Sequence, residues 1–102
     1  MYAEGKGVKQ NLAKAVEWYK RAAEQGKAYA QFNLGVMYKE GRGVKQDSAK
    51  AAEWFKKAAE QGNAGAQFNL GKMYEVGDGV EQDSVKAADW YKKAAMPKQD
   101  GV

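Results

Sequence analysis

One short motif in the sequence could do chemistry, because it places two glycines one residue apart ahead of a valine and a glutamine. It occurs three times, as GKGVKQN, GRGVKQD and GDGVEQD, at residues 5–11, 41–47 and 77–83. The backbone amides of a glycine-spaced loop can cradle a phosphate, although a single G-x-G is a weak sign of such a site. A function assigned to one copy must therefore hold for all three.

The charges of the three copies argue against a phosphate site. Lys6 and Arg42 are replaced by Asp78 in the third copy, and Lys45 is replaced there by Glu81. A cradle for an anion would not keep its affinity through that inversion of charge, yet the glycines, the valine and the glutamine are unchanged. We interpret the motif as a turn between helices. One glycine ends a helix, and the other adopts a positive φ.

The last residue of each copy stands where the N-cap of the next helix should be. These residues are Asn11, Asp47 and Asp83, and their side-chain oxygens can accept hydrogen bonds from amides that have no partner within the helix. At the other end of the helices, Gly26 and Gly62 stand where a left-handed C-terminal residue is expected.

The composition leaves little chemistry outside this motif. The chain has no cysteine and no histidine, so neither a thiolate nor an imidazole can bind zinc or relay a proton near neutral pH. Only Asp, Glu, Lys and Tyr remain, and no pair of carboxylates is forced into one site. We expect no enzymatic activity, no metal and no cofactor. Because the chain has no cysteine, the sequence does not indicate whether the protein belongs to an oxidising or a reducing compartment. The residues predict no localisation.

The charge pattern bears on the class of partner. The net charge is +4, but residues 1–36 sum to +3 (six basic, three acidic), residues 37–72 to +3 (seven, four) and residues 73–102 to −2 (four, six). Lysines alternate with glutamates at helical spacing, and the tryptophans belong to an apolar stripe, so no nucleic-acid partner is expected. No stretch approaches the roughly 18 apolar residues of a membrane span, so no membrane partner is expected.

The tyrosines and tryptophans recur at a fixed interval. Trp18, Trp54 and Trp90 are 36 residues apart, and residues 27–62 are identical to residues 63–98 at 23 of 36 positions. Such a repeat predicts an all-α fold, an α/α superhelical solenoid of 36-residue helix–turn–helix units. We expect one domain over residues 1–102, with a partial repeat at 1–26, full repeats at 27–62 and 63–98, and a loose tail at 97–102.

Each repeat is predicted to contain two helices. The first spans 28–41 and 64–77, and the second spans 11–25, 47–62 and the matching segment of the last repeat. Gly35 and Gly71 lie within the first helices, where they would let a neighbouring helix approach closely. The buried stripes are predicted to contain Ala30, Leu34 and Tyr38 in the first helix and Ala51, Trp54, Phe55, Ala58 and Ala59 in the second. The expected i,i+4 ion pairs are Glu17–Arg21, Glu53–Lys57 and Asp89–Lys93.

These motifs resemble those of a known family. The pattern A-x-A-Q-F-N-L-G-x-M-Y, then G-x-G-V-x-Q-D, then K-A-x-x-W-[YF]-x-K-A-A is similar to the Sel-1-like repeat (SLR), a relative of the tetratricopeptide repeat, and covers residues 1–95. The resemblance implies a superhelix whose first helices line a concave groove, and a role as an adaptor that assembles protein complexes. The β-lactam activity described for cysteine-rich members is not implied, because this chain has no cysteine.

Positions that differ between the repeats are free to bind a partner. Counted from the shared leucine, these positions resemble the positions whose side chains face the groove in tetratricopeptide repeats. Two phenylalanines and two asparagines are expected on the same face of the first helices. The alternatives are that variable positions are simply exposed, that Phe32 and Phe68 pack between helices, and that each asparagine bonds within or between helices. The candidate partner-binding residues are Tyr29, Phe32, Asn33, Val36, Lys39, Glu40, Phe68, Asn69, Lys72, Glu75 and Val76.

The sequence thus favours a non-catalytic scaffold that binds a protein or peptide in the concave groove. The alternative is a self-associating structural module, a homo-oligomer formed through the N-terminal helix at 11–25. The stripe of that helix, formed by Ala15, Trp18, Tyr19 and Ala22, has no first helix of its own to cover it. A fragment of a longer repeat array would leave the same stripe bare.

Overall fold

The computed structural model describes residues 6–96, and these residues form helices joined by turns, without a strand. The helices are α1 (Lys6–Glu24), α2 (Ala28–Glu40), α3 (Ser48–Glu60), α4 (Ala64–Val76) and α5 (Ser84–Ala95). The predicted all-α class is confirmed. The tail predicted to be loose, from residue 97 onward, lies outside the described residues.

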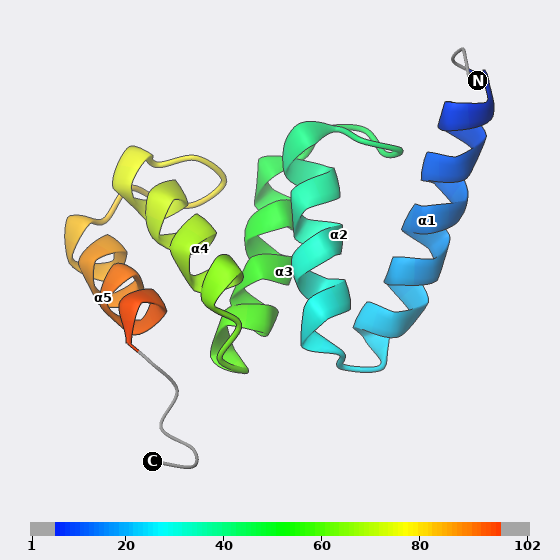
Figure 1. The fold of residues 1–102 in the computed structure, drawn as a ribbon. Helices are drawn as coiled ribbons and strands as arrows, with labels where there is room; N and C mark the ends of the chain where they lie inside the picture. The colour runs from blue at the N-terminus through cyan, green and yellow to red at the C-terminus, as the bar shows by residue number, and fades with distance from the viewer. Residues whose placement is uncertain (1–5, 97–102) are drawn as a thin grey trace.

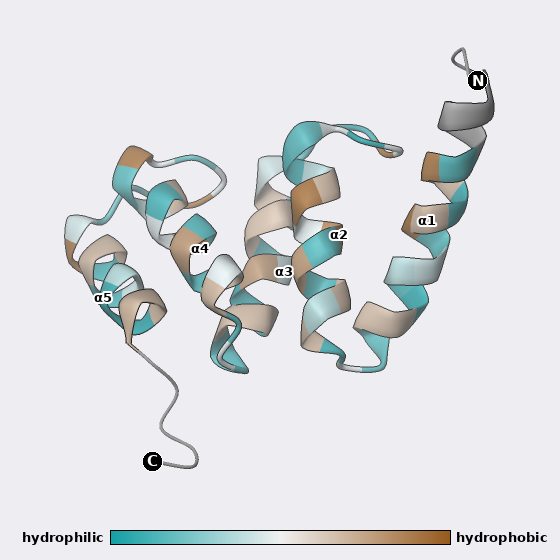
Figure 2. Cartoon of the chain, viewed as in Figure 1, coloured by the Kyte–Doolittle hydropathy of each residue, from teal (hydrophilic) through white to brown (hydrophobic). Residues whose placement is uncertain are grey.

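Neighbours along the chain are also neighbours in space. The most extensive packing joins α2 to α3 and α4 to α5, which are the two helices of one repeat, and smaller contacts join α1 to α2 and α3 to α4. Figure 1 shows the helices following one another in an arc. Figure 2 shows that hydrophobic and hydrophilic residues alternate around the described helices. The result is the predicted solenoid, in which each helix buries one stripe against the next.

The predicted stripes form the core. Ala30, Leu34 and Tyr38 are buried in α2, and Phe55 is fully buried in α3. Ala51, Ala58 and Ala59 are buried as well, whereas Trp54 is half-buried and packs against the core from its edge.

The helical glycines let α2 and α4 approach their partners, as predicted. A Cβ on Gly35 would lie 2.8 Å from the ring of Phe55, and a Cβ on Gly71 would lie 2.9 Å from the ring of Tyr91. Such distances are shorter than van der Waals contact, so only glycine allows each aromatic ring to lie flat against the helix backbone.

The second and third copies of the double-glycine motif are turns that lock adjacent repeats together. Gly41 ends α2 with φ 70°, and Asp47 begins α3 by accepting a 3.1 Å hydrogen bond from the amide of Lys50. Gly43 has φ 77°, and a Cβ there would lie 2.9 Å from the carbonyl oxygen of Leu12 in the preceding repeat. The third copy repeats this arrangement, with Gly79 against the carbonyl oxygen of Ser48. The motif therefore positions helices.

The first copy of the motif differs from the prediction. Helix α1 begins at Lys6, so the backbone of residues 6–11 is helical and Asn11 lies within the helix, not at its N-cap. In the other copies the turn rests on the second helix of the preceding repeat, and among the described residues no such helix precedes α1.

The predicted i,i+4 ion pairs do not form either. Among the described residues, the ion pairs are Lys39–Asp78, at 3.9 Å, and Arg42–Glu40, at 3.7 Å. The amino group of Lys57 instead lies 5.2 Å from the centre of the Trp54 ring, and that of Lys93 lies 4.6 Å from the centre of the Trp90 ring. Each of these lysines can contact either the aromatic ring three residues before it or the acid four residues before it. The contact with the ring does not require a carboxylate to lose its water.

Candidate protein-interaction site

Four of the candidate residues meet at one place between the two full repeats. Lys39 from α2 and Lys72, Glu75 and Val76 from α4 line a small hollow of about 100 Å³, together with Met73 and Asp78. We call these six residues the charged hollow. Lysines and acids stand opposite each other in it, and the amino group of Lys39 lies 3.9 Å from a carboxylate oxygen of Asp78. The hollow can therefore accept hydrogen-bonding groups of either charge.

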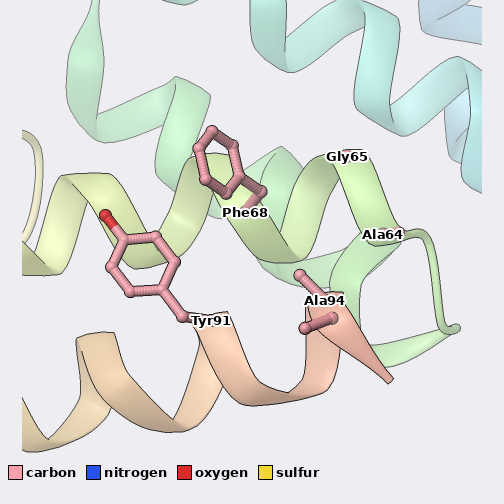
Figure 3. A pocket seen from close by; sticks show the side chains of 6 residues that line it. Ala64, Gly65, Phe68, Tyr91 and Ala94 are labelled. Atoms are coloured by element: carbon pink, nitrogen blue, oxygen red, sulfur yellow. The ribbon is translucent and has the colours of Figure 1, made fainter. Parts of the chain in front are cut away.

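A larger apolar hollow lies beside it, between α4 and α5. It has a volume of about 580 Å³ and is lined by Ala64, Gly65, Phe68, Tyr91, Ala94 and Ala95. Figure 3 shows the ring of Tyr91 rising from α5 towards α4 and the ring of Phe68 lying over α4. The two ring centres are 5.5 Å apart and the planes are tilted by 46°. Phe68 is 51% exposed, so its ring is available to a ligand.

Two polar groups connect the two hollows. The amino group of Lys72 lies 5.7 Å from the centre of the Phe68 ring. The hydroxyl of Tyr91 donates a 2.6 Å hydrogen bond to Oε1 of Glu75. Three effects raise the pKa of Tyr91 to about 12: the largest is this hydrogen bond, the next is the loss of solvation, and the smallest is the negative charge of Glu75. Tyr91 therefore stays protonated at physiological pH.

The aromatic candidates from α2 are not lining residues of either hollow. Tyr29 is 47% exposed and pairs with Trp18 of α1 at 6.1 Å between ring centres. Phe32 is half-buried between repeats, with its ring 5.9 Å from that of Phe55. A Cβ on Gly65 would lie 2.9 Å from Phe32. Phe32 therefore packs between helices, which was the alternative interpretation of this residue, whereas its counterpart Phe68 is exposed.

The asparagine candidates bond within their own helices. The side-chain amide of Asn33 donates to the carbonyl oxygen of Tyr29, and that of Asn69 donates to the carbonyl oxygen of Gly65, both at 2.9 Å. Their nitrogen atoms are therefore engaged. Of the other candidates, Val36 is half-buried against the core, and Glu40 is exposed and pairs with Arg42 at the start of the turn.

Sequence reasoning missed two residues of this region, Tyr91 and Asp78. The counterpart of Tyr91 in the preceding repeat is Phe55, and the added hydroxyl is the signal in the sequence that its environment differs. Asp78 was treated only as a reversal of charge relative to Arg42. The structure places it within reach of Lys39, a residue of the preceding repeat.

The described residues offer no cluster of three or more side chains of the kinds that hold a metal ion. Within the same part of the chain, no helix combines the length and the apolar character that crossing a membrane requires.

Comparison with known proteins places the chain in a family. The family described as Sel1 repeat matches residues 1–27, 28–63 and 64–96. The chain therefore belongs to the Sel1 repeat family, whose members are generally non-catalytic scaffolds for protein interaction. A search of curated proteins gave no match.

Solved structures of the same fold are similar to this chain. A protective antigen of uropathogenic Escherichia coli strains that displays an SLR fold is 55% identical, with a TM-score of 0.80 over 81% of this chain and 18% of its own. A Sel1 repeat protein from Oxalobacter formigenes is 42% identical, with a TM-score of 0.80 over 81% of this chain and 34% of its own. Cysteine rich protein B of Helicobacter pylori is 28% identical, with a TM-score of 0.76 over 79% of this chain and 61% of its own. The chain thus spans between about a fifth and three fifths of these relatives.

Proposed function

We propose that the chain is a non-catalytic scaffold that binds a segment of a partner protein across α2 and α4. The observation that carries the proposal is the convergence of Lys39, Lys72, Glu75 and Val76 on the charged hollow. These positions come in pairs that differ between the repeats, Lys39 with Glu75 and Val36 with Lys72, whereas the residues that build the core are shared. A surface that varies on a constant framework is suited to recognition of one partner.

The chemistry of the hollow indicates what the segment should carry. Two lysines and two acids favour a partner with both charges, and the exposed ring of Phe68 beside Lys72 favours an apolar side chain next to them. The acids of this region are engaged in structural pairs, Asp78 with Lys39 and Glu75 with Tyr91, which supports a binding role rather than acid–base catalysis.

The test is selection of peptides from a displayed library on the full chain, followed by calorimetry with the variant Lys39→Ala/Lys72→Ala/Glu75→Ala. We expect micromolar binding by the wild-type chain and at least a tenfold loss in the triple variant, since truncation at a binding centre costs more than about 1.4 kcal/mol. Circular dichroism of the variant checks that helicity is retained. Equal affinities of the two proteins for every selected peptide would end this assignment.

A second candidate function, self-association through α1, is favoured by a separate observation. Trp18 is 55% exposed and Tyr29 is 47% exposed, and their rings form an aromatic pair on the surface where α1 meets α2. Exposed aromatic pairs of this kind anchor many protein interfaces. Sedimentation velocity over a concentration series tests it: a dimer that disappears in Trp18→Lys supports the candidate, and a monomer at every concentration discards it.

A further inference from the structure

Two of the four charged residues of the charged hollow already pair with each other. Lys39 of α2 and Asp78, in the turn after α4, lie 3.9 Å apart and so join the two full repeats. The other two, Lys72 and Glu75, are three residues apart on α4, and both are exposed. Residues at this spacing are neighbours on a helix surface, yet in the described part of the chain these two form no ion pair. They are therefore the two charges that a partner can use.

The amino group of Lys72 is drawn towards the N-terminal end of α4. It lies 5.7 Å from the centre of the ring of Phe68, which stands about one turn before Lys72 on the same helix. The negative face of an aromatic ring attracts an ammonium group. This contact places the positive charge of Lys72 on the side that faces away from Glu75.

The carboxylate of Glu75 is held from α5. The ring of Tyr91 lies against α4 at Gly71, where a Cβ would approach it to 2.9 Å. Its hydroxyl reaches the next turn of α4 and donates a 2.6 Å hydrogen bond to Oε1 of Glu75. In Figure 3 this hydroxyl lies farther along α4 from Ala64 than Phe68 does. An ionised carboxylate has about four acceptor positions, so this bond fixes Glu75 and still leaves it able to accept from a partner.

The preceding repeat lacks this arrangement. The counterparts of Lys72, Glu75 and Tyr91 there are Val36, Lys39 and Phe55, which supply neither an acid nor a hydroxyl. The helices α2 and α3 nevertheless pack together as extensively as α4 and α5 do. The separated charges are therefore not required to build a repeat, which favours a role in recognition.

We propose that the segment bound in the charged hollow is extended and carries an acidic side chain against Lys72 and a basic side chain against Glu75, two residues apart. This inference rests on the proposed function, whose partner it describes more closely. Side chains three residues apart on a helix start about 5–6 Å from each other, and these two diverge. Alternate residues of an extended segment face the same side about 6.6 Å apart, so an acid and a base at that spacing match the pair. Because Lys72 and Glu75 are positioned before binding, less side-chain freedom is lost when the partner binds.

The probes are peptides selected on the full chain whose binding is weakened by the triple variant Lys39→Ala/Lys72→Ala/Glu75→Ala. We expect these peptides to be enriched in an acid and a base two residues apart. A second version of each peptide has its acid and base exchanged, and calorimetry compares the two. The exchanged peptide should bind the wild-type chain at least about tenfold more weakly, because each charge then faces a like charge. It should recover most of that loss on Lys72→Glu/Glu75→Lys.

Variants that keep the charges of the peptide in place provide the controls. The exchange Glu53→Lys/Lys56→Glu has the same spacing on the exposed side of α3 and should leave both titrations unchanged. Tyr91→Phe keeps Lys72 and Glu75 but releases the carboxylate, so the original peptide should bind about threefold more weakly. A peptide whose base is replaced by glutamine should lose nothing further on Tyr91→Phe. These titrations decide the question even where circular dichroism shows that Lys72→Glu/Glu75→Lys has lost helicity.

The outcomes separate this inference from the proposed function. If no selected peptide is weakened by the triple variant, the proposed function is wrong and this inference is wrong with it. Peptides that depend on the charged hollow but carry charges of one sign would overturn this inference alone. Equal binding of the original and the exchanged peptide to the wild-type chain would do the same, as would an equal loss on Tyr91→Phe for peptides with and without the base.

Discussion

The hydroxyl of Tyr91 in α5 donates a 2.6 Å hydrogen bond to Oε1 of Glu75 in α4. This bond joins the two helices of the last repeat, at a position where the preceding repeat has Phe55 in α3 and Lys39 in α2. It also fixes the side chain of Glu75 in the charged hollow and orients the ring of Tyr91 in the apolar hollow. Two differences between the repeats, Tyr91 in place of Phe55 and Glu75 in place of Lys39, thus shape both the charged hollow and the apolar hollow.

Replacement of Tyr91 by phenylalanine should change the response of the fold to alkaline pH. The pKa of Tyr91 is raised from 10.0 to about 12 by the hydrogen bond to Glu75. A raised pKa in the folded state contributes stability that is fully present below pH 10 and is lost as pH rises through about 12. We therefore expect the midpoint of urea unfolding to fall more between pH 10 and pH 12 in the wild type than in Tyr91→Phe. Parallel curves for the two proteins would contradict the hydrogen bond.

The two helical glycines form a matched pair for a test of close packing. Alanine in a helix gains about 1 kcal/mol over glycine, but overpacking a core costs about 1–3 kcal/mol. Phe55, opposite Gly35, is fully buried and cannot move aside, whereas Tyr91, opposite Gly71, is half-buried and can. Gly35→Ala should lower the free energy of unfolding and should be less stable than Gly71→Ala. Urea unfolding measures both, and the reverse order would refute the packing argument.

The sequence predicted the fold because the fold depends on residues that recur in every repeat. Buried alanines, the leucine, the glycines with positive φ and the aspartate caps each have one physical role, and 36-residue periodicity identifies them. The first copy of the double-glycine motif was predicted wrongly: α1 already begins at Lys6, whereas in the later copies the second glycine lies against the carbonyl oxygen of Leu12 or Ser48 in the preceding repeat. Local sequence does not encode that contact.

The candidate site was harder to predict because it depends on side chains that differ between repeats. Lys39, Lys72, Glu75 and Val76 do meet, since their offsets place them on one side of the first helices. Phe32 and Phe68 have identical nearest neighbours in sequence, but among the described residues Phe32 is covered by α4, whereas Phe68 is exposed. Their difference follows from their position in the array, which no local pattern contains.

Lys57 should stabilise α3 through Trp54 and not through Glu53. Its amino group lies 5.2 Å from the centre of the indole ring, and contacts of this kind contribute about 0.5–1 kcal/mol at exposed sites. A double-mutant cycle of Lys57→Gln with Trp54→Leu should show a coupling energy of that size. The matched cycle of Lys57→Gln with Glu53→Gln should show a smaller one. A larger coupling to Glu53, lost in high salt, would restore the ion pair that the sequence suggested.

The three residues that end the double-glycine motifs provide a test of when the motif is a turn. Asp47 and Asp83 accept hydrogen bonds from backbone amides at the starts of α3 and α5, at 3.1 Å and 3.0 Å, whereas Asn11 lies inside α1. Replacement of either aspartate by alanine should lower the free energy of unfolding by about 0.5–2 kcal/mol. Asn11→Ala should leave it unchanged or raise it, because alanine is the better helix former. A loss in Asn11→Ala equal to that in Asp47→Ala would mean that the first motif is also a turn, so that the contact with a preceding helix is not what decides its conformation.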